Sequence, residues 1–294
     1  MSKEPEFPFG VCLLLSYDGT DFHGWQAQPG LRTVQGAVEA AIAEMGASSS
    51  ALRACSRTDA GVHALGQLAA FGSQAEIPAE GWVHGLNKGL PKDVVVRDAA
   101  ACFYRYNPRF HARSKRYRYL VRCADRREPL LRHQAWHLTP NNARHDDGEI
   151  QEDVVEAYLD VPAMREAAKA LIGTHDFNAF RAASDERETT ERTMFGLRVL
   201  PGWQGRRDLL AIEVEGSAFM KNMVRIMVGT LVDVGRGKLS QANITTMLRD
   251  GAVREDAGQT APAHGLTLVD IELARYDGPG DAFGRPTEAQ PPRG

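Results

Sequence analysis

Long apolar runs are missing from this sequence of 294 residues, and no stretch is long enough to cross a bilayer as a helix. The N-terminal MSKEPEFPFG also lacks the apolar segment of a signal peptide. Cysteine is scarce, because only Cys12, Cys55, Cys102 and Cys123 occur, far apart and without a C-x-x-C pair. That spacing favours free thiols over a disulfide framework or a zinc site. We therefore expect a cytoplasmic globular protein that does not associate with membranes.

Phosphate-binding glycine motifs are absent as well. The sequence contains neither G-x-x-x-x-G-K-[ST] nor G-x-G-x-x-G, which cradle the phosphates of nucleotide cofactors. The isolated His23 and His63 fit structural roles better than metal ligation. The sequence therefore predicts no cofactor and no metal, so the side chains themselves must supply any chemistry.

Charge is small in total but unevenly distributed. The net charge is −3, yet residues 105–132 contain ten basic and only two acidic side chains. Residues 146–160 are acidic instead. Because local charge steers a polyanion more than the total does, the basic segment indicates a nucleic-acid partner.

The first third of the chain has the pattern of a small α+β unit. Apolar runs bounded by turn residues predict strands, and apolar residues at helical spacing after the N-cap Thr33 predict the first helix. The expected strands cover residues 9–17, 51–55, 65–73 and 93–102, and the second helix covers residues 79–88. This β-α-β-β-α-β order matches the split βαβ, or ferredoxin-like, unit.

The second part of the chain repeats this pattern with longer insertions. We expect strands over residues 115–122, 193–200, 208–216 and 265–276, and helices over residues 162–172, 217–235 and 240–249. The predicted fold is α+β: two ferredoxin-like halves, residues 1–108 and 109–276, joined into one mixed or antiparallel sheet with a central cleft. Residues 277–294, rich in proline and glycine, are predicted to be a disordered tail, and residues 141–153 a polar surface loop.

Asp59 lies in the turn SRTDAGVHALGQ, residues 56–67, between two predicted strands. In one interpretation it is a turn residue that binds its own backbone. In the other it is an ionised carboxylate displayed in a cleft, where it can attack a carbon that bears a good leaving group. Arg57, two residues earlier, is close enough to pair with it.

Two further segments combine basic and apolar side chains. On a strand, KRYRYLVR directs Lys115, Tyr117 and Tyr119 to one face, and Arg116 and Arg118 to the other. This pattern fits either an amphipathic strand with a tyrosine core or a surface where a base stacks on tyrosine and arginines meet phosphate.

In SAFMKNMVRIMVG, Lys221 and Arg225 have i, i+4 spacing. They form either a solvated rim with snorkelling stems or a site in which Arg225 has a partner, for which Asp59 is the candidate. The turn-rich residues 17–30, with Trp25, read as a packed Ω-like loop.

Several segments, in the same order and spacing, resemble TruA-type tRNA pseudouridine synthases. The most specific is SRTDAGVHALGQ, and the resemblance covers residues 9–275. The other matching segments are YDGTDFHGWQ (17–26), the FHAR-x-K-RYRY run (110–119), HDFNAFRA (175–182), AFMKNMVRIMVG (218–229) and AHGLTL (263–268).

The resemblance implies conversion of uridine to pseudouridine at positions 38–40 of the tRNA anticodon stem-loop, by a homodimer without cofactor or metal. It implies that Asp59 is the essential carboxylate and that Arg57 holds the base out of the stack. Tyr117 stacks on the uracil and accepts the C5 proton, Arg225 faces the aspartate, and Leu266 lines the uracil pocket. The basic side chains Arg116, Arg118 and Lys221 are the expected RNA contacts.

The chain departs from the family pattern in places. Ser56 replaces the usual glycine, Lys221–Asn222 replaces a more usual aromatic or histidine-rich pair, and the polar insertion at 141–157 is longer than in compact members. Two other functions compete: an RNA-binding protein without catalysis, and a nucleoside glycosidase with an aspartate nucleophile. The glycosidase would need a second, paired carboxylate, which is not evident.

Overall fold

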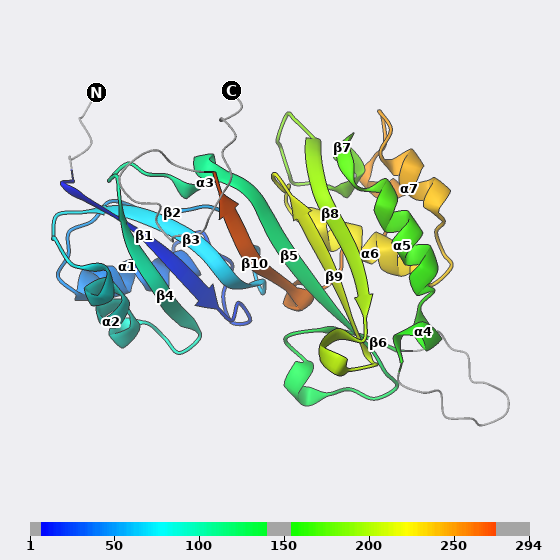
Figure 1. The fold of residues 1–294 in the computed structure, drawn as a ribbon, viewed down its shortest axis with the longest axis horizontal. Helices are drawn as coiled ribbons and strands as arrows, with labels where there is room; N and C mark the ends of the chain where they lie inside the picture. Colours follow the sequence, from blue (N-terminus) through cyan, green and yellow to red (C-terminus); the bar gives the residue numbers. More distant parts are fainter. Residues whose placement is uncertain (1–6, 140–153, 275–294) are drawn as a thin grey trace. The chain divides into compact units, whose positions relative to one another are not determined.

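The computed structural model describes residues 7–139 and 154–274, which form an α+β protein with mixed, mostly antiparallel strand pairing (Figure 1). Its contacts divide the described chain into two compact units. The first unit contains residues 7–114 and 268–274, and the second contains residues 115–139 and 154–267. The end of the last strand, which the predicted division assigned to the second half, therefore packs with the first unit.

The first unit has the predicted β-α-β-β-α-β order. Its elements are β1 Phe9–Tyr17, α1 Val34–Glu44, β2 Arg53–Ala54, β3 His63–Ser73, α2 Ala79–Gly89 and β4 Val94–Cys102. The strands are ordered β4-β1-β3, with β2 and the C-terminal strand β10, Leu266–Leu273, both next to β3. Pairing is antiparallel from β4 through β1 to β3, and β2 is also antiparallel to β3.

Apolar residues at the expected periodicity hold this unit together. Leu13 and Leu15 of β1 are fully buried, and α1 buries Val38 and Ile42. The α1 helix begins where predicted, because the Thr33 hydroxyl accepts a hydrogen bond from the Gly36 N–H. The unit's core therefore follows directly from the sequence pattern.

The second unit is built on the long strand β5, Ala112–Cys123, whose first three residues still belong to the first unit. Its strands are ordered β5-β9-β8-β7, all antiparallel, and β6 runs parallel to β5. The remaining elements are β6 Trp136–Leu138, α4 Val155–Tyr158, α5 Val161–Ala170, β7 Gly173–Asp176, β8 Glu191–Pro201, β9 Leu209–Gly216, α6 Met223–Gly235 and α7 Gln241–Met247. The almost fully buried α6 packs against α5 (Figure 1).

One predicted helix starts later than expected. The prediction placed a helix over residues 217–235, but α6 begins at Met223. Asn222 has φ +60°, a left-handed conformation that a right-handed helix cannot contain. Lys221 therefore precedes the helix, and the predicted i, i+4 pair with Arg225 on one helical face is wrong.

Several short elements were not predicted, because they span too few residues for a periodicity to show. They include β6, β7, α4 and α3 Pro108–His111. The predicted tail at 277–294 and the polar loop at 141–153 lie outside the described residues. Within residues 7–139 and 154–274, no helix has the length and apolarity required to cross a membrane.

Candidate active site

Asp59 lies in the tight loop that joins β2 to β3 in the first unit. Its carbonyl accepts a hydrogen bond from the Val62 N–H at 3.1 Å, which closes a turn, and its side chain is half-buried. Gly61 has φ +78°, a conformation that favours glycine. The turn therefore requires the glycine that follows T-D-A.

The loop at residues 17–30 packs directly against the Asp59 turn. The Trp25 N–H donates to the Thr58 carbonyl at 3.0 Å, and the Gly61 N–H donates to the Phe22 carbonyl at 3.3 Å. At Gly24, with φ +89°, an added Cβ would lie 2.8 Å from the Thr58 carbonyl oxygen. The packed-loop interpretation of this segment is therefore confirmed, and what it packs against is the Asp59 turn.

A buried polar network holds the loop that carries Asp59. The Tyr17 hydroxyl lies 2.8 Å from the Thr58 hydroxyl, and the fully buried Gln67 side chain donates to the Ser56 carbonyl at 2.5 Å. Burial raises the pKa of Tyr17 to about 12, against the lowering effect of hydrogen bonds with Thr58 and Gln67. Sequence reasoning missed Tyr17 and Gln67; the signal for Gln67 was a lone amide in an otherwise apolar strand.

Arg57 is exposed, whereas its neighbour Thr58 is buried. Within the described part of the first unit, no ion pair joins Arg57 to Asp59. The predicted pairing of these two residues is therefore absent. The exposed guanidinium is compatible with the alternative role of contacting RNA.

Tyr117 is buried on β5 of the second unit. It lies opposite Val214 of β9 and meets the Phe219 ring edge to face, with centroids 5.1 Å apart and an interplanar angle of 81°. Lys115, Tyr117 and Tyr119 are all buried, whereas Arg116 and Arg118 are only half-buried. The alternation predicted for this strand is thus confirmed.

Arg225 is held by two neighbouring segments of the same unit. Its Nε donates to the Ala261 carbonyl at 2.7 Å, and its Nη1 donates to Asn222 Oδ1 at 2.9 Å. The Arg225 carbonyl accepts in turn from the Ala261 N–H. The left-handed Asn222 therefore both starts α6 and orients the arginine side chain.

Residues 261–266, the segment that contains Ala261, contact Tyr119. The Tyr119 hydroxyl donates to the Pro262 carbonyl at 2.7 Å, and a Cβ on Gly265 would lie 2.5 Å from the Tyr119 ring. Burial raises the pKa of Tyr119, although Arg225 opposes this effect. Leu266, which follows directly, is buried at the start of β10.

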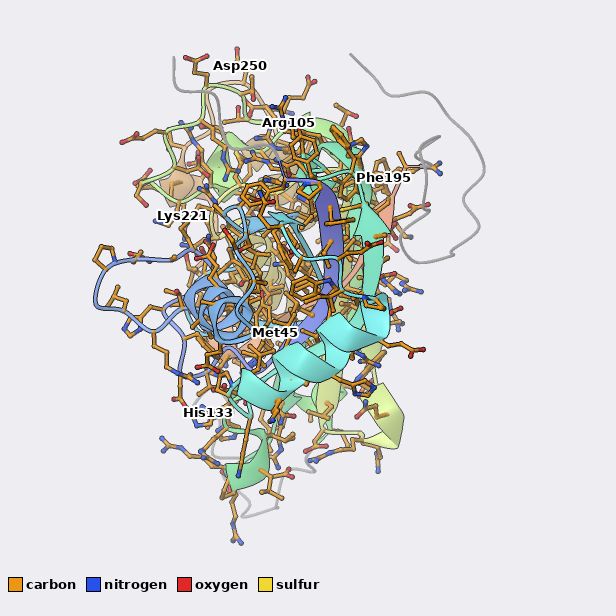
Figure 2. The ribbon with its side chains drawn as sticks, turned by 90° about the vertical axis from the view of Figure 1, so that its left-hand side faces the viewer. Met45, Arg105, His133, Phe195, Lys221 and Asp250 are labelled. Carbon is orange, nitrogen blue, oxygen red and sulfur yellow. The ribbon has the colours of Figure 1, made fainter. Side chains whose placement is uncertain are left out.

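The remaining predicted RNA contacts have partners within the second unit. Arg118 donates to Glu213 Oε1 from Nε and Nη2 at 2.9 and 2.7 Å, and it stacks on the Trp203 ring at 4.3 Å. Lys221 is exposed, and its Nζ donates to the Ser184 hydroxyl at 3.1 Å (Figure 2). Arg116 lies opposite Glu215 across the β5–β9 pair. Part of the basic segment's charge is therefore balanced locally.

A cavity of about 320 Å³ opens in the second unit. Its lining includes Arg127, Arg132, Trp136, His137 and His264. His133 and His137 have H-x-x-x-H spacing, but His133 lies on the surface (Figure 2) and His137 Nε2 bonds the Ala124 carbonyl at 2.8 Å. Among the residues that the structure describes, no group of three histidine, cysteine or acidic side chains could hold a metal ion.

Known proteins of similar sequence match most of this chain. A family model described as tRNA pseudouridine synthase matches residues 14–111 and 167–277. The tRNA pseudouridine synthase A of Geobacter sulfurreducens is 43% identical over 90% of this chain and 99% of its own length. The protein of the same name from Shouchella clausii is 42% identical over 89% of this chain and 92% of its own length. A third, from Geobacter sp. strain M21, is 40% identical over 89% of this chain and 97% of its own length.

Proposed function

The chain belongs to the tRNA pseudouridine synthase family, and we propose that it isomerises uridine at positions 38–40 of the tRNA anticodon stem-loop. The observation that carries the proposal is the Asp59 turn. The 17–30 loop and a buried polar network hold that turn, while its carboxylate remains half-exposed.

The proposed reaction conserves the atoms of uridine. The N1–C1′ bond breaks, the uracil rotates, and C5 forms a bond to C1′; C5 then loses its proton and N1 gains one. Asp59 either attacks C1′ directly or first removes a proton from the sugar, and both routes need the same ionised carboxylate. The departing uracil is an anion, which nearby donors stabilise before it reattaches.

The second unit contributes most of the proposed base-binding groups, and the first unit contributes Arg57. Tyr117, set against Phe219, offers an aromatic face for stacking and a phenol to accept the C5 proton. Arg225 is oriented by two hydrogen bonds and is proposed to act beside the Asp59 carboxylate. Leu266 supplies apolar surface for the uracil, and Arg57 supports the extruded base. Arg116, Arg118 and Lys221 are the proposed contacts to RNA.

Release of tritium from C5-labelled uridine in tRNA transcripts tests the proposal directly. We expect purified protein to release tritium without added metal, and Asp59→Asn to abolish release while it retains tRNA binding. Asp98→Asn is the matched control, because Asp98 is an exposed acid on β4 of the same unit. Transcripts that carry a single labelled uridine at position 38, 39 or 40 assign the target.

Tight, salt-sensitive tRNA binding without any tritium release would favour the binding-only alternative. Free uracil among the products would instead favour the glycosidase. Loss of both binding and release in Asp59→Asn would give Asp59 a structural role.

We also propose that the protein is a cytoplasmic homodimer. Its two ferredoxin-like halves are proposed to form a central cleft. The tRNA substrate and the four free cysteines both fit a reducing cytoplasm. Light scattering on the purified protein measures the oligomeric state. A monomer at the concentration used in the tritium-release assay would contradict the dimer.

A further inference from the structure

Residues 103–110, FYRYNPRF, form a surface segment of unusual composition in the first unit. Four of the eight residues are aromatic, two are arginine and none is acidic, although the whole chain is only 7% aromatic and has a net charge of −3. Phe110 is 79% exposed and Phe103 is 50% exposed. Large apolar rings at such exposure, next to arginines, suit a partner that offers both flat apolar surface and negative charge.

The arginines of this segment face solvent. Arg105 lies at the surface, where its guanidinium is 5.1 Å from the Tyr104 ring centroid (Figure 2). Arg109 is exposed on the short helix α3. Neither side chain forms an ion pair with a residue of the described chain. Their charge is therefore not balanced locally, unlike that of Arg118.

The segment is held in one conformation despite its exposure. Arg53 donates from Nε to the Tyr106 carbonyl at 3.1 Å and from Nη2 to the Tyr104 carbonyl at 2.6 Å. Tyr106 is buried and stacks on His111, with centroids 4.8 Å apart. A stacking surface fixed in advance loses less entropy when a base binds to it.

The segment also lies beside the strand that leads to Asp59. The Cys55 thiol donates to the Pro108 carbonyl at 3.5 Å, and Asp59 follows Cys55 by four residues. Because an extended chain spans at most about 3.6 Å per residue, Asp59 lies within about 14 Å of Cys55. Nucleotides close to a uridine at Asp59 are therefore within reach of Arg109 and Phe110.

We propose that residues 103–110 are a stacking surface for unpaired nucleotides that flank the target uridine in tRNA. Phe110 stacks on a base, and Arg105 and Arg109 contact the adjoining phosphates. The inference rests on the proposed function, and it assigns a contact surface outside the reacting groups. RNA is favoured over a protein partner because the exposed charges are all positive and lie between the rings.

The test measures tRNA affinity over a range of salt concentrations, together with tritium release at saturating tRNA. Phe110→Ala should raise Kd about tenfold without changing the salt dependence, and Phe110→Trp should restore affinity. Arg105→Ala with Arg109→Ala should lower the slope of log K against log salt by about 1.4 to 1.8. Tritium release at saturation should remain at the wild-type rate.

Two control variants match these changes. Leu130→Ala removes an apolar side chain of nearly equal exposure, 81%, from the second unit. Lys92→Ala with Arg97→Ala removes two exposed positive charges elsewhere in the first unit. Unchanged affinity in Phe110→Ala, or equal losses in the controls, would overturn the proposal. So would a change of oligomeric state in Phe110→Ala at unchanged affinity, which would make this surface a protein interface.

Failure of the proposed function gives a different result. A wild-type protein that binds tRNA but releases no tritium would contradict the isomerase activity, and the affinity measurements would still decide the stacking surface. A wild-type protein that binds no tRNA would contradict both.

Discussion

The side-chain amide of Gln67 and the backbone of Ser56 are joined by two hydrogen bonds. Gln67 Nε2 donates to the Ser56 carbonyl at 2.5 Å, and the Ser56 N–H donates to Gln67 Oε1 at 3.3 Å. The Gln67 side-chain amide thus pairs with the Ser56 N–H and carbonyl as the backbone of a neighbouring strand would, and it holds the chain three residues before Asp59. Among the described non-glycine residues only Gln204 and Asn222 have positive φ, so serine at position 56 imposes no backbone strain.

We expect Gln67→Leu to destabilise the protein by about 1–3 kcal/mol, because it leaves two partly buried backbone groups unpaired. Turnover should fall more than tRNA affinity, since the change displaces Asp59 and Arg57 but not the proposed RNA contacts of the second unit. Urea unfolding and tritium release measure the two effects. Ser56→Gly is the control, because it keeps both backbone groups, and an equal loss in that variant would contradict the interpretation.

Gly24 and Gly30 provide a matched pair for the packing of the 17–30 loop. Both have positive φ, but only at Gly24 would a Cβ meet other atoms within 4 Å, the nearest of them the Thr58 carbonyl oxygen. Gly30→Ala should cost about 1–2 kcal/mol for its left-handed conformation. Gly24→Ala should cost more and should also slow tritium release. Equal thermal and kinetic effects in the two variants would contradict the proposed support of Asp59 by this loop.

Tyr117→Phe separates stacking from proton transfer. The variant keeps the ring that packs on Phe219, so the melting temperature and tRNA affinity should stay near their wild-type values. If the phenol takes the C5 proton, tritium release should fall by about a hundredfold or more. A full rate in Tyr117→Phe would exclude the proton-acceptor role and leave stacking alone.

The carboxylate of Asp208 gives the second unit an acid-sensitive contribution to stability. Burial acts to raise its pKa, but hydrogen bonds from Arg206 and Arg122 outweigh burial and lower the pKa below the usual 3.8. Because the pKa of this carboxyl is lower in the folded than in the unfolded state, the ionised carboxylate stabilises the fold at a pH above its pKa in the unfolded state. This stabilisation is lost as the pH falls through its pKa in the folded state.

Asp208→Asn should therefore lower the unfolding free energy by about 2 kcal/mol at pH 7. The difference from wild type should shrink as pH falls below about 4. Urea unfolding at several pH values checks this, and a constant difference down to pH 2 would contradict the assignment.

The sequence predicted the elements whose pattern extends over many residues. Strands such as β1 and β5 and the capped helix α1 were found within a few residues of the prediction. The Asp59 turn was also recognisable, because its glycine and aspartate are local signals. The start of α6 was not, since nothing in the letters K-N-M marks a left-handed asparagine.

Long-range contacts explain the rest of the difference. The support of Ser56 by Gln67, and of Arg225 by Ala261, joins residues that no periodicity relates. The charge pattern likewise gave a basic segment but not the pairing of Arg118 with Glu213. Which arginines remain available to RNA depends on the folded neighbours of each one.

The position of β10 has a consequence for how the protein is made. This strand lies next to β3, where the Val269 carbonyl lies close against Gly66. The ribosome synthesises β3 early and β10 only after nearly all of the second unit. The second unit can therefore fold before the last strand of the first unit has been made. A nascent chain that stops before Leu268 would carry β3 with an open edge, which is a template for aggregation.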